Sequence, residues 1–584
     1  MVKDKNIIRI SIISMTLSVL FIIGYWLNME VKDGLSPISQ PEYMDKIFQK
    51  GKVHEIDIQV DEKDWEYLLE NAIQKEYIMG DVVIDGETFS CVGIRTKGNS
   101  SLTSVANDST TDRYSLKIDF HEYAKNQTYY GLEKLALNNC IFDTTYMKEY
   151  LSYEMFEKMG IATPACSYVH MTINGVDWGL YLAVEVMEES FIERYFGSAE
   201  GNLYKPESTN LAKGGDKGNK RVMGPNFIPK DQEEMNKNEN LALMKEEMGE
   251  KENKNMGPNG MSRGGTNLVY TGDDLSNYSG IFDEAVFVTT TKKDYKKVVE
   301  MIKNLNEGTN LEEYLDVDEI LKYFAVNTFL VNLDSYASNL KHNYYLYERN
   351  GIFQILPWDL NMSFAAFQMK DAQEAINFPI DTPVNGDTME NSPLISKLLE
   401  VDEYKERYYQ YLRTLVTEYI ESGEYEDSLS QIHVLIRDYV ANDPTAFYTY
   451  EEYQKAVPVL LQFGYDRAKS VMAQLEGEQP SMSYGDISTS VDLSLLGSNG
   501  MGGPKKDRNQ IAWDAPNEKP PWGDQKPNQG MGQAPSDRNG GNKGIKHPMD
   551  RKKAINKDAW IIIGSSMAAL LIALLFAYRF QRRK

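Results

Sequence analysis

The chain reads Asn332-Leu-Asp-Ser-Tyr-Ala-Ser-Asn-Leu-Lys-His-Asn-Tyr-Tyr-Leu-Tyr347 and, shortly afterwards, Leu356-Pro-Trp-Asp-Leu-Asn-Met-Ser-Phe364 at the point that decides which fold we expect. Before this stretch, apolar residues recur at close to helical spacing from Val317 to Val331, which predicts a buried helix. After this helix, the runs Asn343 to Tyr347 and Ile352 to Leu356 resemble strands and are joined by a turn at Arg349-Asn-Gly351, which predicts a β-hairpin.

Four polar residues stand at fixed places around this hairpin. Asp334, Asn339 and Asn343 follow the predicted helix, and Asp359 comes directly after the second strand. A buried helix, a loop with Asp and Asn, a hairpin and a second Asp is the order of parts in a protein-kinase catalytic site. The alternative is that Asp334 and Asn339 cap a turn and that Asp359 is a solvated loop carboxylate.

Eight segments of the chain, in the same order, resemble the CotH kinase family, whose members are secreted or envelope-attached atypical kinases. They span roughly residues 50 to 470. The segments are Arg95-Thr-Lys-Gly-Asn-Ser-Ser101, Tyr114-Ser-Leu-Lys-Ile-Asp119, Leu135-Ala-Leu-Asn-Asn139, Met147-Lys-Glu-Tyr-Leu151, Gly179-Leu-Tyr-Leu-Ala-Val-Glu185, Gly201-Asn-Leu-Tyr-Lys205, Asn332 to Tyr347, and Pro357-Trp-Asp-Leu-Asn361. The departures from the family are a long insert after Lys205, the flanking apolar segments, and Asn361, where the family often has a second acidic residue.

The resemblance implies an α+β, bilobal, protein-kinase-like fold with a β-rich small lobe and a mostly helical large lobe. Apolar runs near both ends, outside the resemblance, predict two transmembrane helices that flank this fold. The hairpin formed by 167–173 and 178–186 and the helix that follows, 188–196, have the order of a kinase small lobe that runs into its hinge. Glu185 to Met187 would be that adenine-binding hinge.

The loop Lys97-Gly-Asn-Ser-Ser101 offers a flexible backbone, hydroxyl groups and a cation, which are the groups that bind phosphate oxygens. The resemblance implies that Arg95, Lys97 and Ser100 bind the phosphates of ATP, and that Lys205 is a further phosphate contact. A plain surface turn and an exposed lysine are the alternatives.

Lys117 alternates with Leu116 and Ile118, so its side chain points away from theirs. The resemblance implies that Lys117 is the strand lysine that touches the α- and β-phosphates and that a helix glutamate orients it. Of two candidates on the predicted helix 143–159, Glu149 and Glu154, we choose Glu149. The alternative for Lys117 is a solvent-facing strand lysine.

By the same resemblance, Asp334 is the base or the group that orients the acceptor hydroxyl. Asp359 and Asn343 would hold Mg²⁺ or Mn²⁺ against the phosphates. Asn339 lies five residues after Asp334, the spacing of the usual kinase loop, whereas the family resemblance favours Asn343 as the metal ligand.

Composition narrows the partners. The chain has 584 residues and a net charge of −24, which argues against nucleic acid, because binding phosphate backbones needs a basic face. The charge is compatible with a basic, Ser-rich protein substrate. Nothing indicates an oligomeric state. Three cysteines, Cys91, Cys140 and Cys166, are too few for a disulfide scaffold and are expected to be buried thiols.

Two apolar runs, Ile7 to Leu27 and Ala559 to Tyr578, are about long enough to span a bilayer. Basic residues flank the outer end of each run, which predicts cytoplasmic tips and an extracytoplasmic body attached to the cell membrane. A cleaved signal peptide is the alternative for the first run.

The resulting division of the chain has nine parts. They are 1–6 a cytoplasmic tip, 7–28 a transmembrane signal anchor, 29–50 a linker, 51–205 the small lobe and hinge, 206–267 a disordered insert, 268–479 the large catalytic lobe, 480–557 a Gly/Pro-rich stalk, 558–578 a transmembrane helix, and 579–584 a basic tail.

The leading hypothesis is an extracytoplasmic kinase that transfers the γ-phosphoryl group of ATP to Ser or Thr of envelope or spore-coat proteins. A catalytically silent adhesion or scaffold protein with the same fold is the second hypothesis. A carbohydrate-processing enzyme with paired carboxylates is a distant third.

Overall fold

The computed structural model describes residues 40–207 and 264–497, and all of them belong to one unit of the chain. Both predicted membrane segments, 7–28 and 558–578, lie outside the described residues, as do most of the predicted insert and stalk. Within the two described ranges, no helix has both the length and the apolar character that crossing a bilayer requires.

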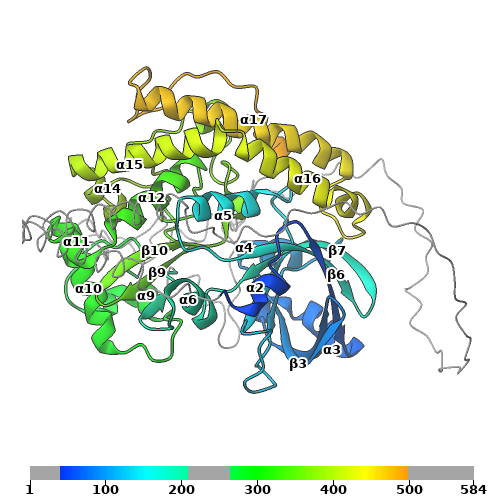
Figure 1. Ribbon diagram of the computed structural model, residues 1–584. Coiled ribbons are helices and arrows are strands. Elements are labelled where there is room, and N and C mark those ends of the chain that lie inside the picture. Colours follow the sequence, from blue (N-terminus) through cyan, green and yellow to red (C-terminus); the bar gives the residue numbers. More distant parts are fainter. Residues whose placement is uncertain (1–39, 208–263, 498–584) are drawn as a thin grey trace, which may run out of the picture. The chain divides into compact units, whose positions relative to one another are not determined.

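Seven strands of the N-terminal region close into a β-barrel (Figure 1). They are β1 Val53–Val60, β2 Ile78–Ile84, β3 Glu87–Thr96, β4 Leu116–Asp119, β5 Lys134–Asn138, β6 Cys166–Ile173 and β7 Val176–Glu185. Their order around the barrel is β1-β2-β3-β4-β5-β7-β6, and only β1 and β6 pair in parallel. Closure removes the free edges that an open sheet would present.

Strand alternation decides which side chains enter the barrel. Ile94, Leu116 and Ile118 are buried in the apolar interior, whereas Arg95 and Lys117, which pair across β3 and β4, are only partly buried. Because successive side chains point to opposite faces, Arg95 and Lys117 lie on the outer face. The outer face of β3, β4 and β5 therefore carries the charged residues of the site described below.

Short helices surround the barrel. They are α2 Glu42–Lys46, α3 Glu62–Glu70, the 3₁₀ helix η1 Ala72–Gln74, α4 Ser100–Ala106 and α5 Lys148–Lys158. An acidic residue caps the start of α3, because the Asp61 side chain accepts a hydrogen bond from the backbone N–H of Lys63.

The C-terminal part is mostly helical, around a small sheet with strand order β10-β9-β8. Its strands are β8 Asn202–Tyr204, β9 Tyr344–Arg349 and β10 Ile352–Pro357. Its helices are α6 Glu189–Phe196, α9 Ser279–Phe282, α10 Lys292–Glu307, α11 Leu311–Tyr314, α12 Val317–Phe329, α13 Ala372–Ile376, α14 Pro393–Leu399, α15 Asp402–Leu415, α16 Glu424–Asn442 and α17 Tyr450–Leu475. In Figure 1, α15, α16 and α17 run across the top of the molecule, and the barrel strand β3 lies at the bottom.

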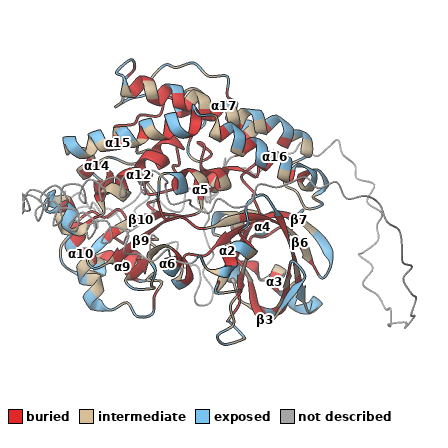
Figure 2. Cartoon of the chain, in the orientation of Figure 1, coloured by how far each residue is buried: buried red, intermediate tan, exposed pale blue. Residues whose placement is uncertain are grey.

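Two apolar clusters form the core (Figure 2). One fills the barrel, and the other joins the helical part to the outer side of the barrel. Helix α5 belongs to the second cluster and packs against α12, where the rings of Phe156 and Tyr323 lie 5.3 Å apart. A buried ion pair, Arg113 with Asp443 at 2.9 Å, ties the segment before β4 to the residue that follows α16.

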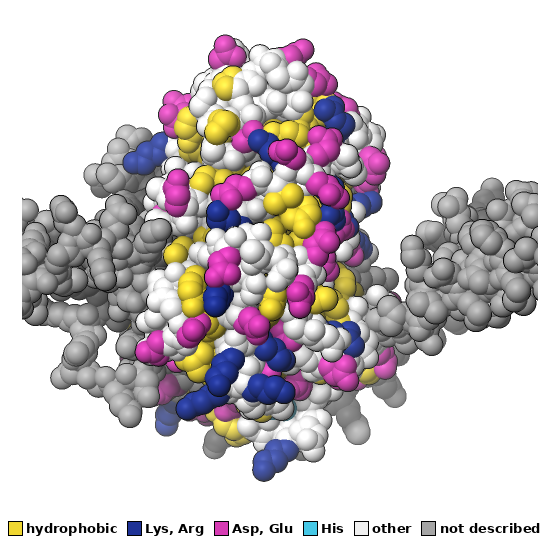
Figure 3. Space-filling model, turned by 90° about the vertical axis from the view of Figure 1, so that its left-hand side faces the viewer, with side chains coloured by type: hydrophobic (Ala, Val, Ile, Leu, Met, Phe, Trp, Pro, Cys, Tyr) yellow, Lys and Arg dark blue, Asp and Glu magenta, His cyan; other side chains and the backbone are white. Residues whose placement is uncertain are grey.

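The face of the molecule shown in Figure 3 mixes both signs of charge. Over most of the face shown in Figure 3, acidic and basic side chains are interspersed with small apolar areas. Such mixing is typical of a soluble exterior that keeps large single-sign fields low.

The mixed α+β class, with a β-rich N-terminal region and a helical C-terminal part, is confirmed. Folded structure extends beyond several predicted boundaries. Residues 40–50 of the predicted linker include buried Tyr43 and Ile47, and residues 264–267 of the predicted insert include fully buried Thr266 and Asn267. The start of the predicted stalk, 480–557, also contacts the folded part of the chain. Its residue Ser481 accepts a hydrogen bond, through the backbone carbonyl, from the backbone N–H of Asp381.

Candidate active site

Asp334 lies in the loop after α12 and is held by two side chains of the same loop. Its Oδ1 is 2.6 Å from Nε2 of His342, and its Oδ2 accepts a hydrogen bond from Nδ2 of Asn343 at 3.0 Å. The carboxylate is 13% exposed. Among the described residues, only these two side chains donate hydrogen bonds to the Asp334 carboxylate, and no backbone N–H does. A residue that caps a turn accepts from backbone N–H groups, so this alternative role of Asp334 does not match the geometry.

Asp359 follows β10 and adopts a left-handed backbone conformation with φ 56°. Its backbone N–H donates to the hydroxyl of Tyr153 on α5 at 3.2 Å, which places the residue between α5 and the hairpin. No hydrogen bond or ion pair to its carboxylate is found within the described part of the chain. A non-glycine residue in this strained conformation is a feature that often marks a functional site.

Lys97, Asn138 and Glu149 form a relay between the barrel and α5. The Lys97 ammonium donates to Asn138 Oδ1 at 2.5 Å, and Asn138 Nδ2 donates to Glu149 Oε2 at 2.8 Å. Burial and, after it, the negative charge of Asp359 raise the pKa of Glu149 to about 7. Burial lowers the pKa of Lys97, while the charges of Asp359 and Glu149 oppose that change. Lys97 therefore lies within the field of both acids.

The structure does not bring Lys117 to Glu149. The Lys117 ammonium lies 3.5 Å from Oε1 of Glu188, a carboxylate that also binds Lys134 at 2.8 Å. Burial lowers the pKa of Lys117 to about 8. The reason is register: Arg95 pairs with Lys117 across β3 and β4, and Lys97 lies two residues beyond Arg95. Two residues of extended chain amount to roughly 7 Å, which separates the two lysines along the barrel.

The other predicted phosphate contacts of this region are Arg95, near the end of β3, and Ser100, the first residue of α4. The Arg95 guanidinium lies 5.2 Å from the ring centroid of Tyr77, and Ser100 is exposed at the start of α4. Gly98 has φ +101°, a conformation that side-chain-bearing residues rarely adopt. This glycine allows the chain to turn sharply from β3 into α4 directly after Lys97.

Lys205 lies near Asp359 and forms an ion pair with Glu207 at 2.6 Å. Burial would lower the pKa of Lys205, but the charges of Glu207, Tyr345 and Asp359 raise it above its ordinary value. Lys205 is therefore a charged, partly buried lysine beside the second aspartate.

The Glu185 carboxylate, expected at the hinge, is already occupied. It accepts hydrogen bonds from the hydroxyl of Tyr43 at 2.5 Å and from the backbone N–H of Ala165 at 2.9 Å, and it forms a buried ion pair with Arg194. Since the side chain is fully buried, any contact of this segment with an adenine ring would have to use its backbone groups.

The two asparagines considered as metal ligands, Asn339 and Asn343, have different hydrogen-bond partners. Asn343 donates to Asp334, whereas Oδ1 of Asn339 accepts a hydrogen bond from Nε2 of Gln368 at 2.6 Å. The structure thus brings Asn343, and not Asn339, to the Asp334 carboxylate.

Taken together, these contacts and fields define one group of side chains, which we call the charged cluster. Its members are Lys97, Asn138, Glu149, Lys205, Asp334, His342, Asn343 and Asp359. His342 links its two ends: burial alone would lower the pKa of His342, but Asp334, Glu207 and Asp359 raise it.

His342 and Asn138 are members of the charged cluster that were not predicted from the sequence. His342 stands next to Asn343 in the stretch that decides the fold, so a titratable side chain beside a predicted ligand was a usable signal. Asn138 ends a strand of five residues, and nothing in its local pattern indicates that it reaches α5.

The charged cluster fits a divalent cation that is also held by phosphates. Oε1 of Glu149 is buried without a hydrogen-bond partner, and the neighbouring Asp359 is the charge that raises its pKa after burial. In the described part of the chain, no three His, Cys, Asp or Glu side chains are arranged to bind a metal by themselves. Mg²⁺ commonly uses one or two carboxylates, water and substrate phosphates, so Asp359 with Asn343 would be a sufficient protein share.

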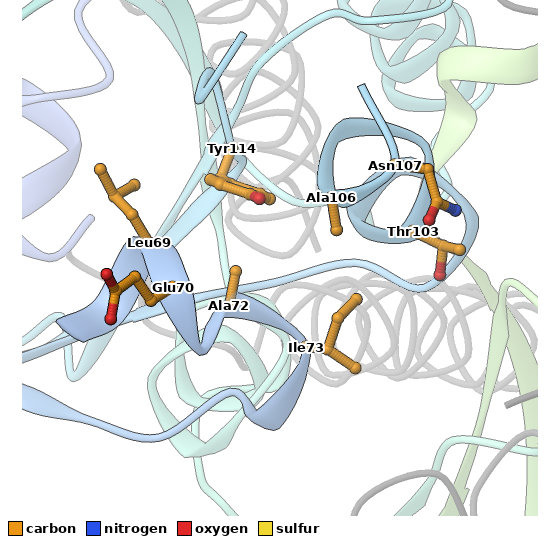
Figure 4. Close-up of a pocket in the computed structure, with 8 residues that line it drawn as sticks. All are labelled: Leu69, Glu70, Ala72, Ile73, Thr103, Ala106, Asn107 and Tyr114. Carbon is orange, nitrogen blue, oxygen red and sulfur yellow. The ribbon is translucent and has the colours of Figure 1, made fainter. Parts of the chain in front are cut away.

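A cavity of about 380 Å³ lies apart from the charged cluster, between α3 with η1 on one side and α4 on the other (Figure 4). Its lining residues are Leu69, Glu70, Ala72, Ile73, Thr103, Ala106, Asn107 and Tyr114. None of the predicted site residues lines it. It marks incomplete packing behind the helix that follows the Lys97 loop.

Comparison with known proteins gives two findings. Residues 94–471, more than half of the chain, match the protein family described as CotH kinase protein. The chain is also similar to inner spore coat protein H of Bacillus subtilis (strain 168), with 20% identity over 358 residues that cover 60% of this chain and 82% of that protein. The matched residues include the whole charged cluster. The chain therefore belongs to the CotH kinase family.

Proposed function

We propose that the protein is an atypical protein kinase that transfers the γ-phosphoryl group of ATP to Ser or Thr hydroxyls of other proteins. Membership of the CotH kinase family implies the use of ATP. The observation that carries the proposal is the union in one cluster of Asp334, Asp359 and the Lys97–Asn138–Glu149 relay. These are the charges that phosphoryl transfer needs, because its catalysis is almost entirely positioning and charge neutralisation.

On the nucleotide side, Lys97 would bind phosphate oxygens, and Asn138 and Glu149 would fix the direction of its ammonium. Arg95 on the same barrel face would add a second cation. Asp359 and Asn343 would hold Mg²⁺ or Mn²⁺, and the bound ion would neutralise negative charge on the phosphates. Lys117 remains a candidate phosphate contact through its place on the outer face, with Glu188 as its partner.

On the acceptor side, Asp334 would orient the substrate hydroxyl. Each carboxylate oxygen of Asp334 has one partner, His342 or Asn343, and a carboxylate oxygen can accept more than one hydrogen bond. The acceptor oxygen forms a bond to the γ-phosphorus, the bond from that phosphorus to the β–γ bridging oxygen breaks, and Asp334 takes the hydroxyl proton. His342 would keep the carboxylate in a single orientation during this step.

The two structural regions would correspond to the lobes of a kinase. In this proposal the β-barrel with α5 is the small lobe, the helical part is the large lobe, and residues 185–187 connect them as the hinge. The continuous route from β7 through 185–187 into α6 supports this assignment.

The substrate and the location are also proposals. The net charge of −24 favours a basic, Ser-rich protein as acceptor, and the similarity to an inner spore coat protein favours coat or envelope proteins. The apolar runs near both ends, with basic residues on their outer sides, favour attachment to the cell membrane with residues 30–557 outside. Protease added to intact cells should then cut residues between 30 and 557.

The test is phosphoryl transfer by the full-length chain from γ-labelled ATP, with Mg²⁺ or Mn²⁺, to envelope and coat proteins. The proposal predicts that the parent forms labelled phosphoserine or phosphothreonine in these proteins and that the Asp334→Asn variant forms none. ATP binding without transfer to any of these proteins would instead support the silent scaffold.

A further inference from the structure

Lys75 reaches the region of the charged cluster from a part of the chain that precedes the family match. It follows η1 and adopts a left-handed conformation with φ 55°. Its ammonium donates to Oδ1 of Asn99 at 2.7 Å, and Asn99 is two residues after Lys97. The residues that match the CotH kinase family model begin at 94, and none of the eight segments that resemble the family contains Lys75, so no role of Lys75 follows from either comparison.

Two hydrogen bonds fix this position. The hydroxyl of Thr96 on β3 donates to the carbonyl of Ala72 in η1 at 2.5 Å, and both residues are buried. The Lys75–Asn99 bond then joins the end of η1 to the residue that precedes α4. A side chain-bearing residue in the left-handed region costs of order 1 kcal/mol or more and persists only when its surroundings require it.

The charge around Lys75 is unbalanced. Burial and the positive charges of Arg95, Lys205 and Lys97 together lower the pKa of Lys75 to about 8, while the charge of Glu207 opposes them. Among the ion pairs of the described residues, none involves Lys75, Arg95 or Lys97. Lys205, by contrast, is neutralised by Glu207 at 2.6 Å.

Three partly buried cations without a carboxylate partner are unfavourable unless an anion joins them. They converge on one loop, since Arg95 and Lys97 are at its start and Lys75 is bonded to Asn99 within it. The anion must carry several charges, because a single carboxylate would leave two of the three cations unpaired.

We propose that Lys75 is a phosphate-binding residue that completes, with Arg95 and Lys97, a cradle for the polyphosphate chain of the nucleotide. This inference rests on the proposed function and extends it to a residue from outside the matched family region. Asn99 acts as the positioning residue that holds the Lys75 ammonium over the loop.

The experiment is a titration of the full-length chain with Mg²⁺–ATP and, separately, with adenosine. We compare the parent, Lys75→Met and Lys75→Arg. The control is Lys63→Met, which removes the same charge from an exposed position on α3. A charge-assisted hydrogen bond lost from a phosphate corresponds to about a tenfold weaker affinity or more.

We expect Lys75→Met to weaken ATP binding about tenfold or more and to leave adenosine binding within twofold of the parent. Lys75→Arg should retain most of the ATP affinity, and Lys63→Met should match the parent. Unfolding curves of all four proteins check that each is folded.

Two outcomes overturn the inference in distinguishable ways. If the parent binds ATP and Lys75→Met binds it equally well, Lys75 does not contact phosphate and the kinase proposal stands. If the parent does not bind Mg²⁺–ATP at all, both the inference and the proposed function fail. Equal weakening for ATP and adenosine would assign Lys75 a purely structural role.

Discussion

Nε2 of His342 lies 2.6 Å from Oδ1 of Asp334, and both residues come from the loop between α12 and β9. The hydrogen bond fixes one oxygen of the carboxylate, and Asn343 fixes the other at 3.0 Å. An acceptor-orienting group must be held close to its productive geometry, because misplacement by about 1 Å can cost two orders of magnitude in rate.

His342 should therefore act on the transfer step through Asp334. His342→Leu removes the donor and should lower the rate of phosphoryl transfer about tenfold or more, whereas His342→Gln, which can still donate, should recover part of it. Binding of Mg²⁺–ATP should change little in either variant. Transfer rates and nucleotide affinities measured side by side check this, and a His342→Leu variant with the parent's transfer rate would contradict it.

Lys97 should matter more for nucleotide binding than Lys117. Both lie on the outer face of the barrel, but only Lys97 lies in the field of Glu149 and Asp359. Lys97→Met should abolish transfer and weaken ATP binding more than Lys117→Met, although each removes one positive charge. A stronger defect in Lys117→Met would restore the pairing of Lys117 with Glu149 that the sequence suggested.

Glu149 should reduce stability as the pH rises. Its pKa of about 7 in the folded chain lies above its ordinary value of 4.5, so the folded state binds the proton more tightly than the unfolded state. Stability therefore falls from about pH 4.5 to pH 7, by about 2–3 kcal/mol. Glu149→Gln should unfold at a higher temperature than the parent at pH 8 but not at pH 4.5, and it should lose transfer.

Glu157→Gln is the matched control for that prediction, because Glu157 is exposed on the same helix. Its melting temperature should follow that of the parent at both pH values. If the melting temperatures of the parent and of Glu149→Gln differ by the same amount at pH 4.5 and pH 8, burial does not destabilise the charged form of Glu149, and the prediction is contradicted.

Arg113 should be one of the most important residues for stability. Its guanidinium is fully buried and donates to both oxygens of Asp443 at 2.9 Å. It also donates to the backbone carbonyls of Trp178 and Leu180 in β7 and of Asn139 after β5. Arg113→Leu leaves the Asp443 carboxylate buried without its partner and should destabilise the chain by about 3–5 kcal/mol. Chemical unfolding measures this, with Lys455→Ala, which breaks an exposed pair with Glu451, as the control that should change nothing.

Local patterns predicted much of the fold. The helix expected at 317–331 is α12, and the hairpin expected at 343–356 is β9 with β10, joined by Asn350 and Gly351 in the left-handed conformations that such a turn requires. Closure of the barrel could not be predicted. It depends on the parallel pairing of β1 with β6, which joins distant segments without any local signal.

The candidate site was predictable residue by residue but not as an arrangement. The sequence named Asp334, Asp359, Asn343, Glu149 and Lys97, and the structure gathers them in one cluster. From the sequence, Glu149 was predicted to pair with Lys117, and this pairing was wrong. The alternation of side chains along a strand shows which face of the sheet a residue lies on, but not how far along the barrel it lies. Asn138 and Lys75 were not predicted, because each acts through a contact with a segment far away in the chain.

The central claim is that Asp334 serves the acceptor and Asp359 serves the metal-bound nucleotide. The most direct measurement is the affinity of the full-length chain for ATP with and without Mg²⁺ in the parent, Asp334→Ala and Asp359→Ala, with unfolding curves on the same samples. The account predicts that Asp359→Ala loses the Mg²⁺-dependent part of binding while Asp334→Ala keeps it, and that both stay folded. If both variants bind ATP as the parent does and differ only in melting temperature, the assignment of this cluster as a kinase site is contradicted.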